Sequence, residues 1–143
     1  MDISNALRTL KVLIALLYLP MSMAAATVPF SGPYEFRGVT DLGPEVRLEL
    51  RLEVINHTGA DISGASLVVR DGLFSKDTFH SWNSLILFES ESIMLSGVIT
   101  VPRKVLENWR RSGGPRLLMR YRNAQGDSKT ALVRLSSRRV VED

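Results

Sequence analysis

Histidine is the residue whose charge changes most readily near neutral pH, and this chain contains two of them. His57 falls in a predicted turn, and His80 lies three residues after Asp77. A metal site usually needs three or more converging ligands, supplied by His, Asp or Glu where cysteine is missing. Because neither histidine has such neighbours at a recognised spacing, we expect both to be surface or loop residues, with no metal or cofactor bound.

The sequence also shows no recognisable arrangement of residues for nucleophilic catalysis or for catalysis by a pair of carboxylates. The chain has no cysteine and therefore no thiol nucleophile. No serine lies in a Gly-x-Ser-x-Gly sequence, and Ser112-Gly113-Gly114 follows a predicted helix rather than a strand. Glu89 and Glu91 lie about 7 Å apart on one side of an extended chain, a separation that glycosidases use. A solvated polar loop explains this pair better, so the sequence predicts no enzymatic activity.

Arginines that alternate with apolar residues in segment 116–122 offer binding chemistry instead. Arg120 and Arg122 are two residues apart, so both side chains leave the outer face of a predicted strand about 7 Å from each other. This spacing suits one extended polyanion. Arg116 adds a contact further along the strand, and Arg134 joins if the last strand has the matching register. The alternative is that these cations only discourage edge-to-edge pairing of an exposed strand.

The charges are unevenly distributed, although the formal net charge is only +3. Segment 27–102 holds five basic and ten acidic residues, whereas segment 103–139 holds eleven basic and two acidic residues. Such a basic segment can form a surface for an anionic partner. The alternative is that strands from both segments interleave in the fold, so that their charges mix on one surface.

The clearest element is a strand from Val46 to Val54, in which aliphatic and charged residues alternate without exception. This period of two predicts one buried and one solvated face, with Leu50 in the core and Arg51 exposed. A turn at 56–59 follows, where Asn56 begins an N-glycosylation sequon that a eukaryotic source would use.

The remaining patterns predict about seven short strands and at most one short helix, which describes an all-β, antiparallel, immunoglobulin-like β-sandwich over residues 45–136. A polar tail at 137–143 is expected to be flexible. The other expected elements are an irregular lead-in at 27–44 with a short edge strand at 34–39, strands at 62–70, 93–101, 116–122 and 129–135, one or two strands within 73–90, and one or two helical turns at 103–111, ended by Gly113-Gly114-Pro115.

Residues 1–26 have the three parts of a secretory signal peptide. Arg8 and Lys11 give a positive n-region, residues 12–19 form an apolar core, and three alanines precede Thr27. The alternative is an uncleaved membrane anchor, but the apolar run is much shorter than the roughly 20 residues that span a bilayer. We therefore expect cleavage between Ala26 and Thr27, and a soluble product that is periplasmic or secreted.

Three local sequences resemble bacterial immunoglobulin-like or fibronectin-III-like accessory domains. They are an alternating strand that runs into Asn-x-Thr-Gly (50–59), a second strand that ends at Asp-Gly (66–72), and a late hairpin with Tyr before Asn-x-x-Gly (121–126). The resemblance covers residues 45–136 and implies architecture alone, so it assigns no functional residues.

Together these features predict an exported, non-catalytic binding or structural accessory domain of the cell envelope or periplasm. Its expected partner is another envelope or secreted protein, bound by strand addition at an exposed sheet edge. The alternative is an anionic glycan or lipid headgroup, bound through the basic segment at Arg116, Arg120, Arg122 and Arg134. No nucleic acid and no small-molecule cofactor are expected.

Overall fold

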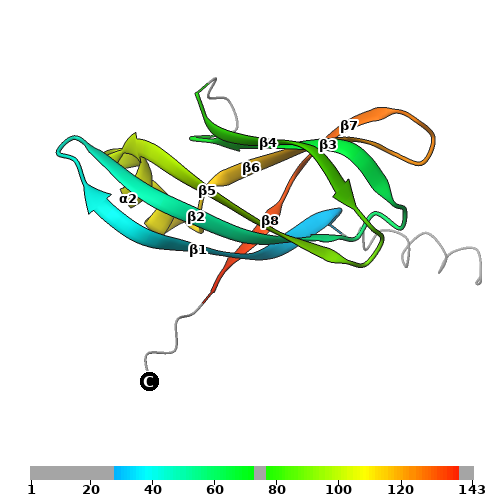
Figure 1. Ribbon diagram of the computed structural model, residues 1–143, viewed down its shortest axis with the longest axis horizontal. Helices are drawn as coiled ribbons and strands as arrows, with labels where there is room; N and C mark the ends of the chain where they lie inside the picture. The colour runs from blue at the N-terminus through cyan, green and yellow to red at the C-terminus, as the bar shows by residue number, and fades with distance from the viewer. Residues whose placement is uncertain (1–27, 73–76, 139–143) are drawn as a thin grey trace, which may run out of the picture.

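Two four-stranded sheets pack face to face, and one helix lies at one end of the sandwich (Figure 1). This computed structural model describes residues 28–72 and 77–138. Sheet A has the strand order β5–β2–β1–β8, and sheet B has the order β4–β3–β6–β7. The predicted all-β sandwich is therefore confirmed. Its elements are β1 (Phe30–Asp41), β2 (Glu45–Asn56), β3 (Ile62–Arg70), β4 (Thr78–Leu87), β5 (Ser92–Pro102), α2 (Arg103–Ser112), β6 (Arg116–Arg122), β7 (Ser128–Leu132) and β8 (Arg134–Ser137).

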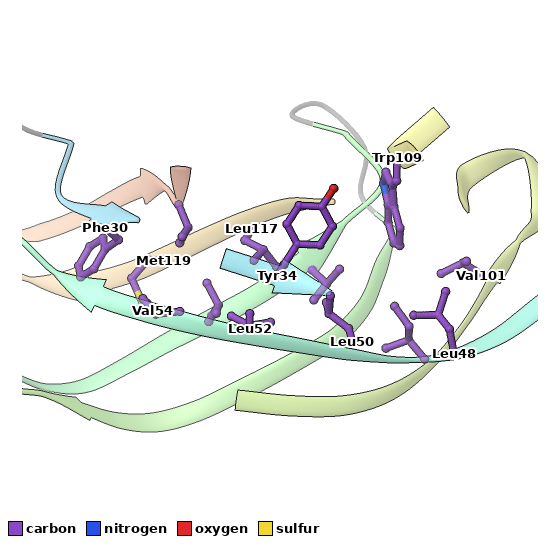
Figure 2. Packing of buried hydrophobic residues seen from close by; sticks show 14 of the residues in the cluster. Phe30, Tyr34, Leu48, Leu50, Leu52, Val54, Val101, Trp109, Leu117 and Met119 are labelled. Atoms are coloured by element: carbon purple, nitrogen blue, oxygen red, sulfur yellow. The ribbon is translucent and has the colours of Figure 1, made fainter. Parts of the chain in front are cut away.

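The alternating residues of β2 form the centre of the core (Figure 2). Leu50 is fully buried, whereas the Arg51 side chain is 41% exposed and bonds to Glu49 on the solvated face. The predicted orientation of this strand is therefore confirmed. Other buried residues of the same core, on β2 and on the facing strands, include Leu48, Leu52, Val54, Leu67, Val69, Leu117 and Met119.

The strand pairing resembles that of immunoglobulin-type sandwiches. Within sheet A, β2 pairs with β5, and within sheet B, β3 pairs with β6. These pairs correspond in order to the B–E and C–F pairs of that architecture. One pairing differs from the expected antiparallel arrangement, because β8 runs parallel to β1.

The expectation of an irregular lead-in with a short edge strand at 34–39 is wrong. β1 has 12 residues and lies inside sheet A, between β2 and β8. Its glycines, which indicated irregular structure, serve the pairing instead. A Cβ at Gly32 would lie 1.7 Å from the Glu53 carbonyl oxygen, so only glycine permits this close approach of β1 to β2. Gly38, at φ +58°, accommodates a register shift between Arg37 and Thr40.

The predicted last strand at 129–135 is also corrected. It divides at Val133, where the chain leaves sheet B as β7 and enters sheet A as β8. Val133 is buried, and its N–H donates to the Leu117 carbonyl at 3.0 Å. Packing of this residue between the sheets therefore fixes the crossing. The start of the predicted flexible tail is ordered, because Ser137 pairs with β1 and the Arg138 N–H donates to the Tyr34 carbonyl.

Segment 73–90 contributes one strand, β4, where one or two were expected. Residues 73–76 lie outside the described part of the chain, as do the predicted signal segment 1–26 and residues 139–143.

The predicted helix is confirmed and is longer than expected, at ten residues. It buries Val105, Leu106 and Trp109, and the Trp109 ring stacks on Phe36 with 6.0 Å between centroids. The helix ends as predicted at Gly113, which takes the left-handed conformation at φ +89°.

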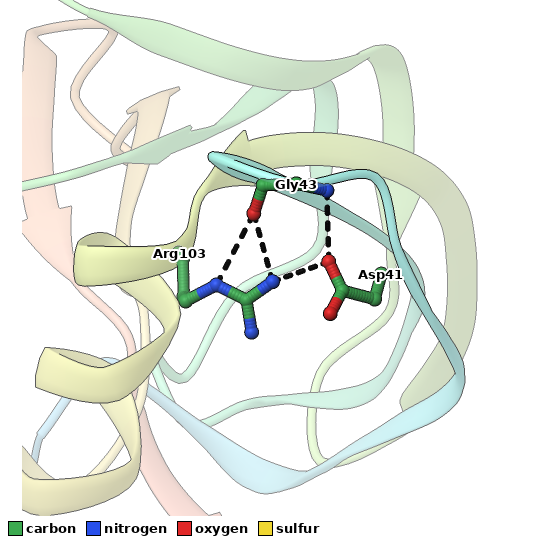
Figure 3. Close-up of polar contacts among 3 residues, drawn as sticks. All are labelled: Asp41, Gly43 and Arg103. Atoms are coloured by element: carbon green, nitrogen blue, oxygen red, sulfur yellow. Dashed lines mark hydrogen bonds and ion pairs between the residues drawn. The ribbon is translucent and has the colours of Figure 1, made fainter.

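A polar contact fixes the start of α2 to the β1–β2 turn (Figure 3). The Arg103 guanidinium donates to the Asp41 carboxylate and, through Nη2 at 2.7 Å, to the Gly43 carbonyl oxygen. Asp41 also accepts the Gly43 N–H at 2.8 Å. The Gly43 N–H, followed by Arg103, lowers the pKa of Asp41 below its ordinary value of 3.8.

This contact predicts a pH-dependent contribution to stability. A lowered pKa in the folded state stabilises the protein above the unfolded pKa of 3.8, and the contribution is lost as the pH falls through the folded value. Asp41→Asn removes the charge, so we expect it to destabilise the protein at pH 7. The difference from wild type should shrink below about pH 4 and vanish when Asp41 is protonated. Urea unfolding between pH 3 and pH 7 measures it; a constant difference would contradict the assignment.

A second prediction concerns Gly114, which follows the helix at φ +111°. A Cβ there would lie 2.6 Å from the Tyr34 ring, so alanine adds a collision to backbone strain. We expect Gly114→Ala to cost about 3 kcal/mol of unfolding free energy. The matched control is Gly59→Ala, at φ +82° with no atom within 4 Å, which should cost about 1 kcal/mol. Equal losses would show that the Tyr34 contact does not matter.

Candidate functional site

The fold separates the charges by sheet instead of mixing them. The strands of sheet A carry four basic and five acidic residues. The strands of sheet B carry five basic residues and no acidic one. This happens because β6 and β7, from the basic segment, join the sheet of β3 and β4 through the pairing of β6 with β3, and the residues of β3 and β4 include no carboxylate. The basic residues of the sheet B strands are Arg70, Arg116, Arg120, Arg122 and Lys129.

Two of the predicted arginines lie together on the outer face of sheet B. Arg120 is exposed and pairs across the strands with Ser66 on one side and Thr130 on the other. Arg122 is exposed and lies opposite Ser128. Because cross-strand partners share a face, hydroxyl groups flank both guanidinium groups. The two arginines, the three hydroxyl residues, Ser63, Gly64, Tyr121 and Lys129 line one shallow hollow, which we call the basic hollow.

The other two predicted arginines lie elsewhere. On β6, Leu118 lies between Arg116 and Arg120. Its cross-strand partners on β3 and β7 are also apolar, so an apolar row across sheet B separates the two arginines. Arg134 belongs to β8 in sheet A, and with Arg116 it lines a second hollow beside the crossing at Val133. The structure therefore brings the four arginines together as two pairs. The predicted register of the last strand did not anticipate the sheet crossing, which removes Arg134 from the basic hollow.

Lys129 also lines the basic hollow, which the sequence patterns did not predict. The hairpin register places it opposite the inward-packed Tyr121, so it lies on the other face of β7 from Ser128 and Thr130, on the edge strand of sheet B. Ion pairs do not neutralise these side chains. Within residues 28–72 and 77–138, the ion pairs are formed by Arg37, Arg51 and Arg103, and none involves a cation of sheet B.

The histidines take different positions. His57 lies in the predicted turn, where its Nε2 is 2.7 Å from Ser31 Oγ. A serine bonded to histidine resembles half of a nucleophilic site, but no carboxylate among the described residues bonds to the His57 ring to orient it. His80 was expected on the surface or in a loop, and this is wrong. It lies half-buried on β4, edge-on to Trp82 at 4.5 Å, and a Cβ at Gly97 would be 2.7 Å from its Nε2.

Carboxylates do not gather into a site in the described part of the chain. Glu89 and Glu91 are both exposed around the turn between β4 and β5, as a solvated loop requires. Within residues 28–72 and 77–138, no three His, Asp or Glu side chains lie together in a way that could hold a metal ion.

Asn56 has a structural role that excludes the glycosylation suggested by its sequon. Its side chain is fully buried, and its Nδ2 donates to the Ala60 carbonyl at 2.9 Å and to the Leu87 carbonyl at 3.0 Å. Its Oδ1 accepts the Thr58 N–H and hydroxyl. Because both amide hydrogens are occupied inside the protein, a glycan cannot be attached in the folded state.

The edge strands offer little room for an added strand. β5 is long and uncharged, but its Ser96 carbonyl accepts the Trp82 indole N–H at 3.1 Å, and His80 covers Gly97. β4 is irregular, with three register shifts against β3. β7 and β8 have five and four residues, and each carries a cation. These features of β4, β7 and β8 discourage strand addition, whereas β5 is covered only locally, at Ser96 and Gly97.

Comparison with known proteins adds no functional assignment. No protein-family model and no curated protein matches this sequence. The chain is similar to a protein from Archaeoglobus fulgidus of known crystal structure, at 13% identity and a TM-score of 0.32, over 69% of this chain and 86% of that one. Across residues 28–72 and 77–138, no helix has the length and apolar character needed to cross a membrane.

The buried amide gives a testable prediction. Asn56→Ala leaves the Ala60 and Leu87 carbonyl oxygens without their donors, so we expect a loss of about 3 kcal/mol in unfolding free energy. The control is Asn83→Ala, which removes an exposed amide on β4 and should cost less than about 0.5 kcal/mol. Urea unfolding measures both, and similar losses would show that the Asn56 bonds contribute little.

Proposed function

We propose that this protein is a non-catalytic binding module of the cell envelope or periplasm, and that the outer face of sheet B binds a polyanion. The observation that carries the proposal is the separation of charge, with four arginines at outer-face positions of sheet B and no carboxylate on its strands. The secretory features of residues 1–26 support export. Export would place the face in contact with the anionic polymers and headgroups of a cell surface.

The chemistry of the basic hollow suits carboxylate, sulfate or phosphate groups. A guanidinium group offers planar paired donors that match such oxyanions, and the hydroxyls of Ser66, Thr130 and Ser128 add neutral donors beside Arg120 and Arg122. In the described chain the two arginines have no ion-pair partner, so an incoming anion displaces only solvent and counterions. Each contact is weak in water, and affinity therefore depends on several anionic groups in one ligand.

Docking of another envelope protein by strand addition receives less support. That mode needs a sheet edge with unpaired backbone groups. The Ser96 carbonyl of β5 is occupied by Trp82, and the other edge strands are short or irregular. The features that distinguish the two expected functions therefore favour the basic face over the edges.

The proposal predicts that the protein is retained on a polyanionic column and that this retention depends on where its positive charges lie. Arg120→Glu with Arg122→Glu should abolish retention at low salt and leave the melting temperature nearly unchanged, because both side chains are exposed. Wild-type retention should fall steeply with salt, since the Debye length is about 8 Å at physiological ionic strength.

The matched control is Arg110→Glu with Arg111→Glu, which makes the same change in net charge on the exposed side of α2. This variant should keep most of the retention. Equal losses in the two double variants would show that net charge alone governs retention, and the proposal would then fail.

A further inference from the structure

A further hollow lies at the end of the sandwich, between the turn that joins β2 to β3 and the turn that joins β6 to β7. Its volume is about 310 Å³, which is within the usual range for small-ligand sites. We call it the end hollow. It is lined by Pro29, His57, Thr58, Ala60, Ile62, Tyr121, Asn123, Ala124 and Gln125.

The lining is about half polar and half apolar, and it carries no carboxylate, lysine or arginine. Three side-chain groups of its lining residues have no hydrogen-bond partner among the described residues. They are the Gln125 amide, the Asn123 Nδ2 amino group and the His57 Nδ1. The Asn123 Oδ1 is already occupied, because it accepts the N–H groups of Gln125 and Asp127. These groups include both donors and acceptors, and Tyr121 adds an aromatic side chain.

A sugar ring matches this set of groups. Its hydroxyls both donate and accept hydrogen bonds, as amides do, and its C–H surfaces pack on apolar and aromatic side chains. An acyl chain would leave the amides of Asn123 and Gln125 unpaired, at the cost of a buried polar group without a partner. The end hollow therefore favours a hydroxylated ring over an apolar ligand.

The end hollow adjoins the basic hollow at one shared residue of β6. Tyr121 lines both of them, and Asn123 of the end hollow directly follows Arg122 of the basic hollow. A ligand that lies across both would meet charged groups at Arg120 and Arg122 and neutral hydrogen-bonding groups one ring further along.

We infer that the polyanion is an acidic polysaccharide, with carboxylate-bearing sugars at the basic hollow and one sugar ring seated in the end hollow. This inference rests on the proposed function, because it assigns the ligand of the same face. The charges give the attraction, and the end hollow gives the preference for a sugar over other polyanions.

The experiment compares two ligands of equal charge. Calorimetric titration with a galacturonate tetramer and with an end-capped glutamate tetramer presents four carboxylates in each case, with and without sugar rings. We expect wild type to bind the galacturonate tetramer about tenfold more tightly, the equivalent of one or two added hydrogen bonds. Arg120→Glu with Arg122→Glu should remove binding of both.

Gln125→Ala tests the end hollow directly. It should reduce affinity for the galacturonate tetramer about three- to tenfold and leave affinity for the glutamate tetramer unchanged. Asn83→Ala, an exposed amide on another strand, should change neither. Melting curves check that each variant is folded.

Three outcomes separate the two proposals. Equal affinity of wild type for both tetramers, lost in the double arginine variant, would overturn the sugar inference and leave the polyanion face intact. Binding to phosphatidylglycerol vesicles without binding to the galacturonate tetramer would overturn the sugar inference in favour of a lipid headgroup. No binding of either tetramer or of the vesicles at low salt would overturn both proposals.

Discussion

One buried amide joins the two sheets at the end where the proposed ligand binds. Asn56 is the buried polar side chain of the described residues, and its four hydrogen bonds connect the end of β2, the following turn and the end of β4. Backbone bonds from Asn56 to Ser90 and Glu91 strengthen the same junction. An amide in an apolar core is tolerated only when all its groups are paired. This requirement fixes the β2–β3 turn, and with it the positions of His57 and Thr58 in the end hollow.

The sequence patterns predicted the elements whose burial follows a simple period. β2 is the clearest case, since five aliphatic residues at every second position require one buried face. β1 was predicted too short, as an edge strand at 34–39, because its glycines and prolines resemble those of a loop, whereas Gly32 is needed for close contact with Glu53. The crossing at Val133 depends on contacts with distant residues such as Leu117, which no local pattern encodes. For the same reason, the pairing of Arg120 with Arg122 was predicted and the position of Arg134 was not.

Charge separation has a modest energetic cost in this fold. Exposed cations on one face repel each other, but water and salt screen most of that repulsion. Sheet A avoids it through local pairs such as Arg51 with Glu49 and Arg37 with Glu35. Sheet B lacks this arrangement in its strands, although Ser66, Thr130 and Ser128 occupy positions where carboxylates would fit. Stability alone does not explain that choice of residues, which is consistent with the proposed anionic partner.

The parallel pairing of β8 with β1 has a mechanical consequence. Tension that enters at the start of β1 and leaves at the end of β8 pulls the two strands past each other, over the register from Ser31 with Arg134 to Tyr34 with Ser137. The hydrogen bonds of that pair then carry the load together, in shear, instead of opening one after another. The load path stays within sheet A, so the basic hollow on sheet B keeps its shape under tension.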